Sequence, residues 1–248
     1  TSVMAALLCI LIGLFVGFLV LLAINPAHAW ADGFVRILKG GFHDAPYGVG
    51  KELANAAPLI MTGLSVGFAF KTGLFNIGAA GQYTLGAYGA LYCAIMLKMP
   101  WFVCLIAATI LGGIWGAIPG FFKAYFNINE VITSIMFNWI GLYLVNELVY
   151  QNGTGPMYDV RNTRTLSKNP AFAQSIIPDF GLNKMFQTNS TTIAIFLAAA
   201  VAILIWVVLN KTTFGYELKA VGLNKSAARY AGINEKKNII LSMAIAGA

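Results

Sequence analysis

The run VMAALLCILIGLFVGFLVLLAI (Val3–Ile24) carries no charged side chain, and the first charge in the sequence is Asp32. About 20 consecutive apolar residues form a helix that crosses the hydrocarbon core of a bilayer, at about 1.5 Å of rise per residue. Other charge-free intervals follow, between Glu52 and Lys71, Lys71 and Lys98, Lys98 and Lys123, and Lys184 and Lys211. Repeated runs of this length predict an all-α, polytopic membrane protein.

The overall composition supports the same class. Hydrophobic residues make up 58% of the 248 residues, charged residues make up 10%, and the mean hydropathy is +0.74. Soluble domains carry about 25% charged residues, because water has to wet their surface. The formal net charge of +7 is scattered among the loops. It therefore favours anionic headgroups and cytosolic partners over nucleic acid.

Seven apolar segments divide the chain. We expect membrane spans at about 3–24, 53–70, 79–97, 101–118, 131–150 and 192–209, and the start of a seventh at 239–248. Residues 151–190 are rich in Gly, Pro and Asn, and they predict an extracytoplasmic loop. A membrane span cannot end with unsatisfied backbone groups in lipid. The short seventh segment therefore predicts that the chain is a fragment of a longer protein.

The first span has a competing interpretation. The triplet Ala27-His28-Ala29 resembles the small-residue cleavage site of a signal peptide. However, the apolar run is longer than the apolar region of a usual signal peptide, and no basic segment precedes it. A retained membrane helix is therefore favoured.

Glycines spaced four residues apart occur on several expected spans. Small residues at this spacing let two membrane helices approach closely. The pattern predicts close packing at Gly13 and Gly17, at Gly63 and Gly67, and at Gly112, Gly116 and Gly120. In addition, the dipeptide Pro119-Gly120 predicts the end of the fourth span, because proline interrupts helical hydrogen bonding.

The motifs of common enzymes are missing from the sequence. It contains no GxxxxGK[ST] loop, no HExxH and no GxSxG, and its three cysteines lie in apolar segments without a CxxC pair. We therefore assign no catalytic residue, no metal ligand and no cofactor. Energy for moving a solute must come from a gradient or from a partner protein.

The segment 211–238 is the most basic connection between spans. It carries six Lys and Arg residues. Positive charge close to the ends of membrane helices favours the cytoplasmic side. We therefore expect this segment to be a cytoplasmic loop.

Part of this loop, VGLNKSAARYAGI, predicts a short helix. Asn224 is its expected N-cap, Gly232 follows its C-cap, and Ile233 is the apolar partner of that ending. Small residues such as Ala227 and Ala228 suit a helix that docks into a groove on another protein. A solvated connector between two spans fits the same residues.

The fifth span is the most polar one. Glu130, Ser134 and Asn138 fall on one face at 3.6 residues per turn. Polar side chains in a bilayer are costly unless they face protein or a water-filled cavity. This face therefore predicts part of a solute pathway, and hydrogen bonding between helices is the alternative. A gate or interface role fits Glu130 equally well, because it lies at the expected cytoplasmic end, and the same alternatives apply to Asn127 and Asn129.

The stretch KTGLFNIGAAGQYTLGAYGA (71–90) is rich in glycine and also polar. Glycine permits an irregular backbone, which survives at membrane depth only when it is buried in protein or lines a cavity. Asn76 and Gln82 can satisfy the backbone groups freed there. Two roles fit this stretch: a packed turn, or contact with the solute or the gate.

Three motifs resemble the permease subunits of ABC importers. FGYELKAVGLNKSAARYAGI is similar to the segment that couples these permeases to their ATPases. GLFNIGAAGQYTLGAY and NINEVITSIMFNWI resemble the same group, whose members carry branched-chain amino acids, simple sugars and nucleosides. The forms FNIG-x-x-GQ and NEVITSIMxNW are closest to the nucleoside-type permeases.

The resemblance implies a plan similar to the vitamin B12-type importers, with about ten spans and two permease subunits, identical or different, around one pathway. Cytosolic ABC ATPase subunits would dock between spans six and seven, and a substrate-binding lipoprotein would dock outside. The chain would be a non-catalytic permease subunit in a prokaryotic cell membrane, for nucleosides or alternatively for simple sugars or branched-chain amino acids. The residues implied to couple to the ATPase are Gly222, Asn224, Ala227, Ala228, Gly232 and Ile233.

Two other classes are alternatives, a secondary transporter and a membrane enzyme. Secondary transporters also use interrupted helices near the substrate, but they would be expected to carry acidic groups within the membrane for ion coupling. Glu130 and Glu147 lie only at the ends of the fifth span. No acid–base or metal constellation in the sequence supports an enzyme.

Overall fold

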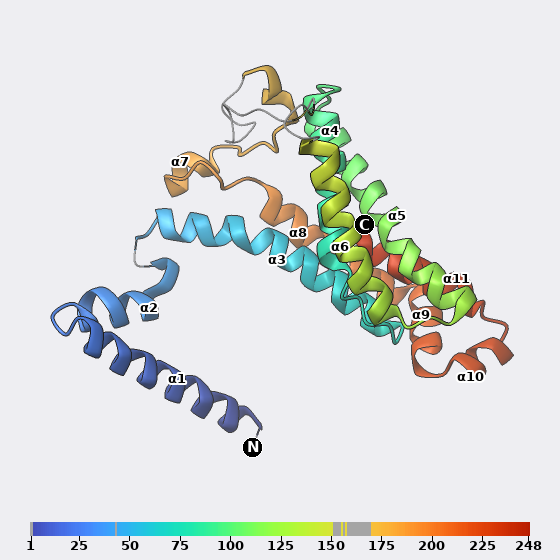
Figure 1. Ribbon diagram of the computed structural model, residues 1–248, viewed down its shortest axis with the longest axis horizontal. Coiled ribbons are helices and arrows are strands. Elements are labelled where there is room, and N and C mark those ends of the chain that lie inside the picture. The colour runs from blue at the N-terminus through green and yellow to red at the C-terminus, as the bar shows by residue number, and fades with distance from the viewer. Residues whose placement is uncertain (1, 43, 151–154, 156, 158–169) are drawn as a thin grey trace. The chain divides into compact units, whose positions relative to one another are not determined.

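The computed structural model describes residues 2–42, 44–150, 155, 157 and 170–248. These residues form helices, turns and connecting segments without a β-strand (Figure 1), which confirms the expected all-α fold. Two units are compact on their own: residues 1–55 with 179–191, and residues 56–178 with 192–248. In the expected extracytoplasmic loop, residues 151–154, 156 and 158–169 lie outside the described part of the chain.

The helical elements follow one another along the chain. They are α1 (Ser2–Ile24), η1 (Ala29–Phe34), α2 (Val35–Lys39), η2 (Gly40–Phe42), α3 (Tyr47–Lys71), α4 (Ala79–Ile95), α5 (Trp101–Phe126), α6 (Glu130–Tyr150), η5 (Pro170–Ser175), α7 (Leu182–Phe186), α8 (Ala194–Lys211), α9 (Thr213–Leu223), α10 (Lys225–Tyr230) and α11 (Glu235–Gly247). Among the described residues, α1, α3, α5, α6 and α8 are long and apolar enough to cross a membrane. The expected cytoplasmic loop therefore contains two helices, α9 and α10.

In the smaller unit, α1 packs against the π-helical segment η1 through aromatic rings. The ring centroid of Phe18 lies 5.6 Å from that of Trp30 and 5.0 Å from that of Phe34. The large apolar side chains along most of α1 are exposed, which suits a helix surrounded by lipid. Among the described residues, no neighbouring atom lies within 4 Å of a Cβ placed on Gly13 or Gly17. The expected packing pair on α1 therefore has no partner there.

The segment that follows α7 lies directly on the first turns of α3. The hydroxyl of Thr191 donates to the carbonyl oxygen of Gly50 at 3.0 Å, and the backbone N–H of Thr191 donates to Oδ1 of Asn183 at 3.0 Å. A Cβ on Gly50 would lie 2.5 Å from the Cβ of Phe186. Glycine at this position therefore allows the close approach.

In the larger unit, α11 lies along α5 (Figure 1), and glycines lie at the contact. A Cβ on Gly116 would lie 3.0 Å from the Cα of Gly247, and a Cβ on Gly120 would lie 3.0 Å from the Cβ of Met243. A Cβ on Gly112 would meet the carbonyl oxygen of Gly247. The close packing expected from these three glycines of α5 is confirmed.

The predicted end of α5 at Pro119-Gly120 is wrong, because the helix continues to Phe126. Pro119 is fully buried, and Gly120 faces α11. Tertiary packing therefore holds the helix together across the hydrogen bond that proline cannot make. The helix ends at Asn127, whose left-handed φ of 53° is one that asparagine adopts more readily than most residues.

Helix α3 also differs from the expectation. It begins at Tyr47, before the expected start at residue 53, and it contains Pro58. The first residues of α3 include the charged Lys51 and Glu52, so hydropathy alone does not detect them. No described neighbouring atom lies within 4 Å of a Cβ on Gly63 or Gly67. The close packing expected of this second glycine pair is therefore not found within the described part of the chain.

A buried apolar cluster joins the end of α3 to the three last helices. Its members are Phe68, Ala69, Leu74, Leu218, Val221, Ala228, Ile239, Met243 and Ala246. Burial of apolar side chains is worth about 25 cal/mol per Å² of surface removed from water. This cluster therefore fixes α9, α10 and α11 against the turn that follows α3.

Candidate functional site

The turn between α3 and α4, residues 72–78, lies inside the protein. Thr72, Leu74 and Asn76 are each at most 1% exposed, whereas the intervening Gly73 and Phe75 are exposed. The turn therefore packs on the protein through alternate side chains. Gly73 has a φ of +69°, a left-handed conformation that favours glycine.

Two buried amides from the sequence-predicted set bind each other across this turn. Nδ2 of Asn76 donates to Oε1 of Gln82 at 2.9 Å, and Nε2 of Gln82 donates to Oδ1 of Asn76 at 3.1 Å. Asn76 also donates to Oγ of Ser65 on α3 and accepts from the backbone N–H of Gly78, each at 3.1 Å. The pair therefore connects α3, the turn and the first turn of α4.

Asn138 of α6 completes the start of α4 from another helix. Its Oδ1 accepts from the backbone N–H of Gly81 at 2.8 Å, and its Nδ2 donates to the carbonyl oxygen of Ile77 at 2.8 Å. The N-cap of α4 is Gly78, which has no side chain to bind the free N–H groups of the first helical turn. Asn138 therefore performs the capping that a residue of α4 itself would normally perform.

Ser134 lies against the same turn, one helical turn before Asn138. Its side chain is 0% exposed, and its Oγ makes no hydrogen bond with any described residue. A Cβ on Gly78 would lie 3.3 Å from the Cβ of Ser134. Buried polar atoms are nearly always hydrogen-bonded. The cluster of Asn76, Gln82, Ser134 and Asn138, here called the amide cluster, therefore contains one unused hydroxyl.

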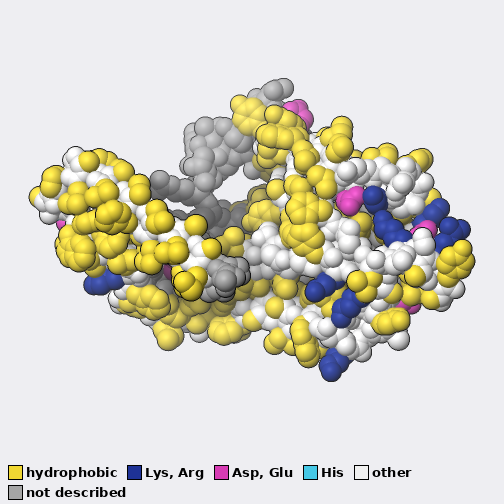
Figure 2. Space-filling model, turned by 90° about the horizontal axis from the view of Figure 1, so that it is seen from below, with side chains coloured by type: hydrophobic (Ala, Val, Ile, Leu, Met, Phe, Trp, Pro, Cys, Tyr) yellow, Lys and Arg dark blue, Asp and Glu magenta, His cyan; other side chains and the backbone are white. Residues whose placement is uncertain are grey.

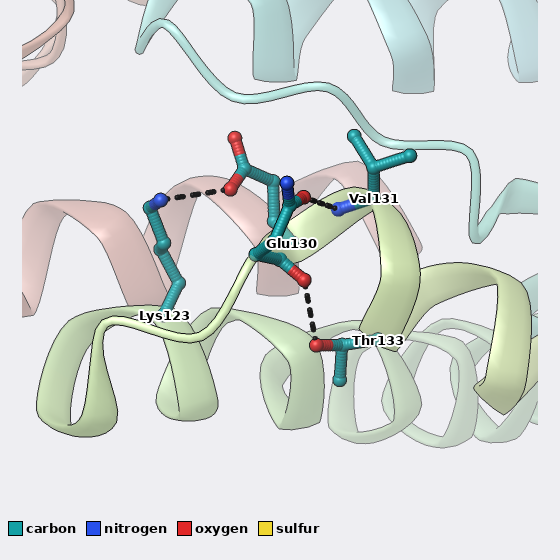
Figure 3. A network of polar contacts seen from close by, with 5 residues as sticks. Lys123, Glu130, Val131 and Thr133 are labelled. Atoms are coloured by element: carbon teal, nitrogen blue, oxygen red, sulfur yellow. Dashed lines mark hydrogen bonds and ion pairs between the residues drawn. The ribbon is translucent and has the colours of Figure 1, made fainter.

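The other polar candidates gather at the turn between α5 and α6. Nζ of Lys123 lies 2.9 Å from Oε2 of Glu130, and their side chains are 16% and 14% exposed. Figure 3 shows these two side chains pointing toward each other from neighbouring helix ends. The ion pair therefore ties the end of α5 to the start of α6.

Asn129 and Asn127 shape the same turn. Oδ1 of Asn129 accepts from the backbone N–H of Val131 at 2.9 Å, and its carbonyl oxygen accepts from the hydroxyl of Thr133 at 2.9 Å (Figure 3). Asn127 is the left-handed C-cap of α5. The structure therefore separates the candidates into the amide cluster and this second group, which contains Asn127, Asn129 and Glu130.

Sequence reasoning misses two partners of these residues and one further buried pair. Lys123 was not paired with Glu130, and Ser65 was not paired with Asn76. The hydroxyls of Thr72 and Ser242 lie 2.7 Å apart and are fully buried, although 170 positions separate them in the sequence. Only the Lys123–Glu130 ion pair could have been predicted from the sequence, because two opposite charges lie on either side of an expected turn.

The predicted ends of the short helix α10 are confirmed. Oδ1 of Asn224 accepts from the backbone N–H of Ala227 at 3.1 Å. After the helix, the N–H of Ile233 donates to the carbonyl oxygen of Ala228, and the N–H of Gly232 donates to that of Arg229, both at 3.0 Å. Gly232 has a φ of +80°. These two bonds form a Schellman ending.

The two alanines of α10 have different positions. Ala228 lies in the buried apolar cluster, whereas Ala227 is exposed. Two large apolar side chains are highly exposed here: Leu223 at the end of α9 (88%) and Tyr230 at the end of α10 (95%). In Figure 2 apolar side chains cover much of the visible face, with Lys and Arg side chains in small groups among them, and Arg229 of α10 is itself exposed. The helix is thus anchored on one side and presents an apolar and basic surface on the other.

Comparison with known proteins identifies the family. The family described as "branched-chain amino acid transport system / permease component" matches residues 50–248. The chain belongs to this family. Together with the five helices that are long and apolar enough to cross a membrane, membership makes the chain a multi-pass cell-membrane permease of an ABC importer. Among the described residues, no group of His, Cys, Asp and Glu is arranged to hold a metal ion.

Relatives match the permease over nearly its whole length. It is 35% identical over 258 residues to the guanosine ABC transporter permease protein NupP of Bacillus subtilis, covering 100% of this chain and 69% of the relative. It is 32% identical over 259 residues to the nucleoside ABC transporter permease protein NupB of Lactococcus lactis, covering 100% and 68%. The glucose ABC transporter permease protein TsgB13 of Haloferax volcanii is 32% identical over 250 residues, covering 97% and 64%. No solved structure matches the permease at a significant level.

Replacing Asn138 with alanine is expected to destabilise the permease by about 1–3 kcal/mol, because the N–H of Gly81 and the carbonyl of Ile77 would lose a buried partner. Ser134→Ala is the matched control on the same face of α6. It should change stability little, because its hydroxyl has no partner among the described residues. Thermal unfolding of both variants in detergent measures the difference, and equal midpoints would contradict the assigned role of Asn138.

Proposed function

We propose that the permease carries nucleosides, as one of two permease subunits around a pathway in a vitamin B12-type arrangement. The observation that carries this proposal is the match, over the whole of this chain, to permeases named for guanosine and for nucleosides. In this proposal the chain is non-catalytic, and separate cytosolic ATPase subunits hydrolyse ATP. A substrate-binding lipoprotein delivers the solute on the outer side.

The chemistry of the amide cluster supports an uncharged solute that carries several hydrogen-bonding groups. Nucleosides offer several hydrogen-bond donors and acceptors, and Asn76, Gln82 and Asn138 offer both kinds of group. In the observed arrangement Asn76 and Gln82 bind each other, so the pair must separate before either amide reaches a solute. Each exchange of partners changes the free energy by only about 0.5–1.5 kcal/mol. The unused hydroxyl of Ser134 is then the group that gains most from a solute hydroxyl.

The exposed side of α10 supports the docking of an ATPase. Leu223, Ala227 and Tyr230 offer apolar contact area, and basic residues around them favour an acidic rim on the partner. The buried Ala228 and the Schellman ending at Gly232 and Ile233 hold this short helix in place. A rigid, anchored helix transmits the movement of a partner better than a flexible loop. The loop containing α9 and α10 lies in the cytoplasm in this proposal.

The glucose permease among the relatives makes a simple sugar the second candidate solute. A sugar would use the same neutral amides and hydroxyl, so the cluster alone does not discriminate it from a nucleoside. A branched-chain amino acid is less suited, since its ammonium and carboxylate groups would need charged or dipolar partners.

The whole importer, reconstituted in lipid vesicles with radiolabelled guanosine, tests the proposal. Uptake is expected to require ATP on the side of the vesicle membrane where the ATPase subunits lie, because those subunits supply the energy in this proposal. A hydrolysis-dead ATPase should reduce uptake to the leak rate, and excess unlabelled nucleoside should compete. Uptake that continues with the hydrolysis-dead ATPase would contradict the ABC mechanism and favour ion coupling. Competition by glucose but not by nucleosides would show that the solute is a sugar.

Gly232→Val is expected to weaken coupling to the ATPase. A β-branched residue at φ +80° costs about 1–2 kcal/mol, which would distort the end of α10 and lower both solute-stimulated ATP hydrolysis and uptake by roughly tenfold. Gly181→Val is the matched control, since Gly181 has a φ of +87° and no described atom within 4 Å of an added Cβ. ATPase and uptake assays of the two variants decide the matter. Normal coupling in Gly232→Val would count against α10 as the docking helix.

A further inference from the structure

The end of α9 touches the turn after α3 through backbone alone. A Cβ on Gly222 would lie 2.5 Å from the carbonyl oxygen of Lys71 and 2.9 Å from the carbonyl carbon of Thr72. A Cβ on Gly73 would lie 3.0 Å from the carbonyl oxygen of Gly222. No side chain can yield at this contact. A displacement of α9 therefore acts directly on the backbone of the turn.

A buried hydrogen bond ties the same turn to α11. The hydroxyls of Thr72 and Ser242 lie 2.7 Å apart, and both residues are fully buried. Asn238, one turn earlier on α11, donates to Oε2 of Glu217 on α9 at 3.0 Å. The turn, α9 and α11 are therefore connected by directional bonds as well as by the glycine contact.

Apolar packing fixes the middle of the turn. Leu74 lies in the buried cluster together with Leu218 and Val221 of α9, Met243 of α11 and Ala228 of α10. Protein interiors are close-packed, so groups in such a cluster move together or change arrangement in discrete steps. The anchored side of α10 thereby reaches the turn through one continuous set of contacts.

The opposite end of the turn is part of the amide cluster. Asn76 follows Leu74 by two residues, and both side chains are buried. Figure 1 shows the connection between α3 and α4 beside α9, in agreement with the contacts of Gly222. Because Gly73 lies only three positions before Asn76, a displacement of Gly73 also shifts the Asn76–Gln82 pair.

We propose that residues 72–76 transmit movement of α9 and α10 to the Asn76–Gln82 pair, with Thr72, Gly73, Gly222 and Ser242 as positioning residues for transport. This proposal rests on the proposed function. When the docked ATPases displace α10, the turn shifts with α9 and α11, and the amide pair opens or closes. Coupling of this kind requires that the two arrangements differ in their contacts with the ATPase.

A purely structural role for these contacts makes a different prediction. Removing one hydroxyl of a buried pair leaves the other without a partner, whereas replacing both by apolar groups of similar shape is nearly neutral for stability. The double variant Thr72→Val/Ser242→Ala therefore separates the two roles. It keeps the packing and removes the bond between the turn and α11.

The experiment measures guanosine imported per ATP hydrolysed by the whole importer in vesicles. Thr72→Val/Ser242→Ala is expected to assemble and to unfold at the wild-type temperature, yet to import about fivefold less guanosine per ATP, the worth of one buried hydrogen bond. Thr72→Ser alone, which keeps both hydroxyls, should import guanosine at the wild-type ratio. An unchanged ratio in the double variant overturns the proposal, and so does a loss of import that matches a loss of assembled complex.

Gly222→Ala tests the backbone contact independently, with Gly63→Ala as its control because Gly63 has no described neighbouring atom within 4 Å of an added Cβ. Gly222→Ala should lower guanosine import per ATP while ATP hydrolysis continues, and Gly63→Ala should match the wild type. A wild-type ratio in Gly222→Ala overturns the transmission role. The wild-type importer separates the two proposals: import that does not depend on ATP overturns the proposed function, whereas ATP-driven import with unchanged ratios in the variants overturns only the transmission.

Discussion

Backbone groups that leave the helical pattern inside a protein have no water to bind, so the protein itself must satisfy them. The turn after α3 meets this constraint with side chains from three elements. Asn76 binds within the turn and to α3 and α4, and Asn138 reaches from α6 to the start of α4. The placement of α6 against α4 follows from these bonds. In the proposed function, these bonds also hold the neutral amides that an uncharged solute contacts.

Close backbone contact is the second constraint on this fold. Apolar side chains gain little by leaving lipid for protein, so membrane helices associate through packing and hydrogen bonds. Gly116 lets α11 lie on α5, and Gly222 lets α9 lie on the turn after α3. The same choice of residue that stabilises the fold leaves no flexible side chain to absorb movement. In the proposed transmission, this stiffness passes movement from α9 and α10 to the amide cluster.

Much of the fold could be predicted from local sequence, because apolar runs and cap residues act over a few positions. Asn224 and Gly232 mark the ends of α10, and the pair Asn76 and Gln82 lies only six positions apart. Glycine spacing predicts helix packing less reliably. The triplet ending at Gly120 contacts α11, whereas no described atom lies within 4 Å of a Cβ added to Gly63. The spacing of glycines shows that another helix can approach closely, but it does not show whether such a helix is present. For the same reason the partners of Asn138 and the Thr72–Ser242 bond could not be predicted, as tertiary packing alone brings them together.

Hydrogen–deuterium exchange of the assembled permease in wild-type and Asn138→Ala form tests the central claim most directly, since it reads single backbone groups of the turn. The account predicts slow exchange at Gly81 and Gln82 in the wild type, exchange faster by about tenfold or more in the variant, and unchanged rates across α11. Equal exchange at these two amides in both forms would contradict the claim that Asn138 fixes the turn.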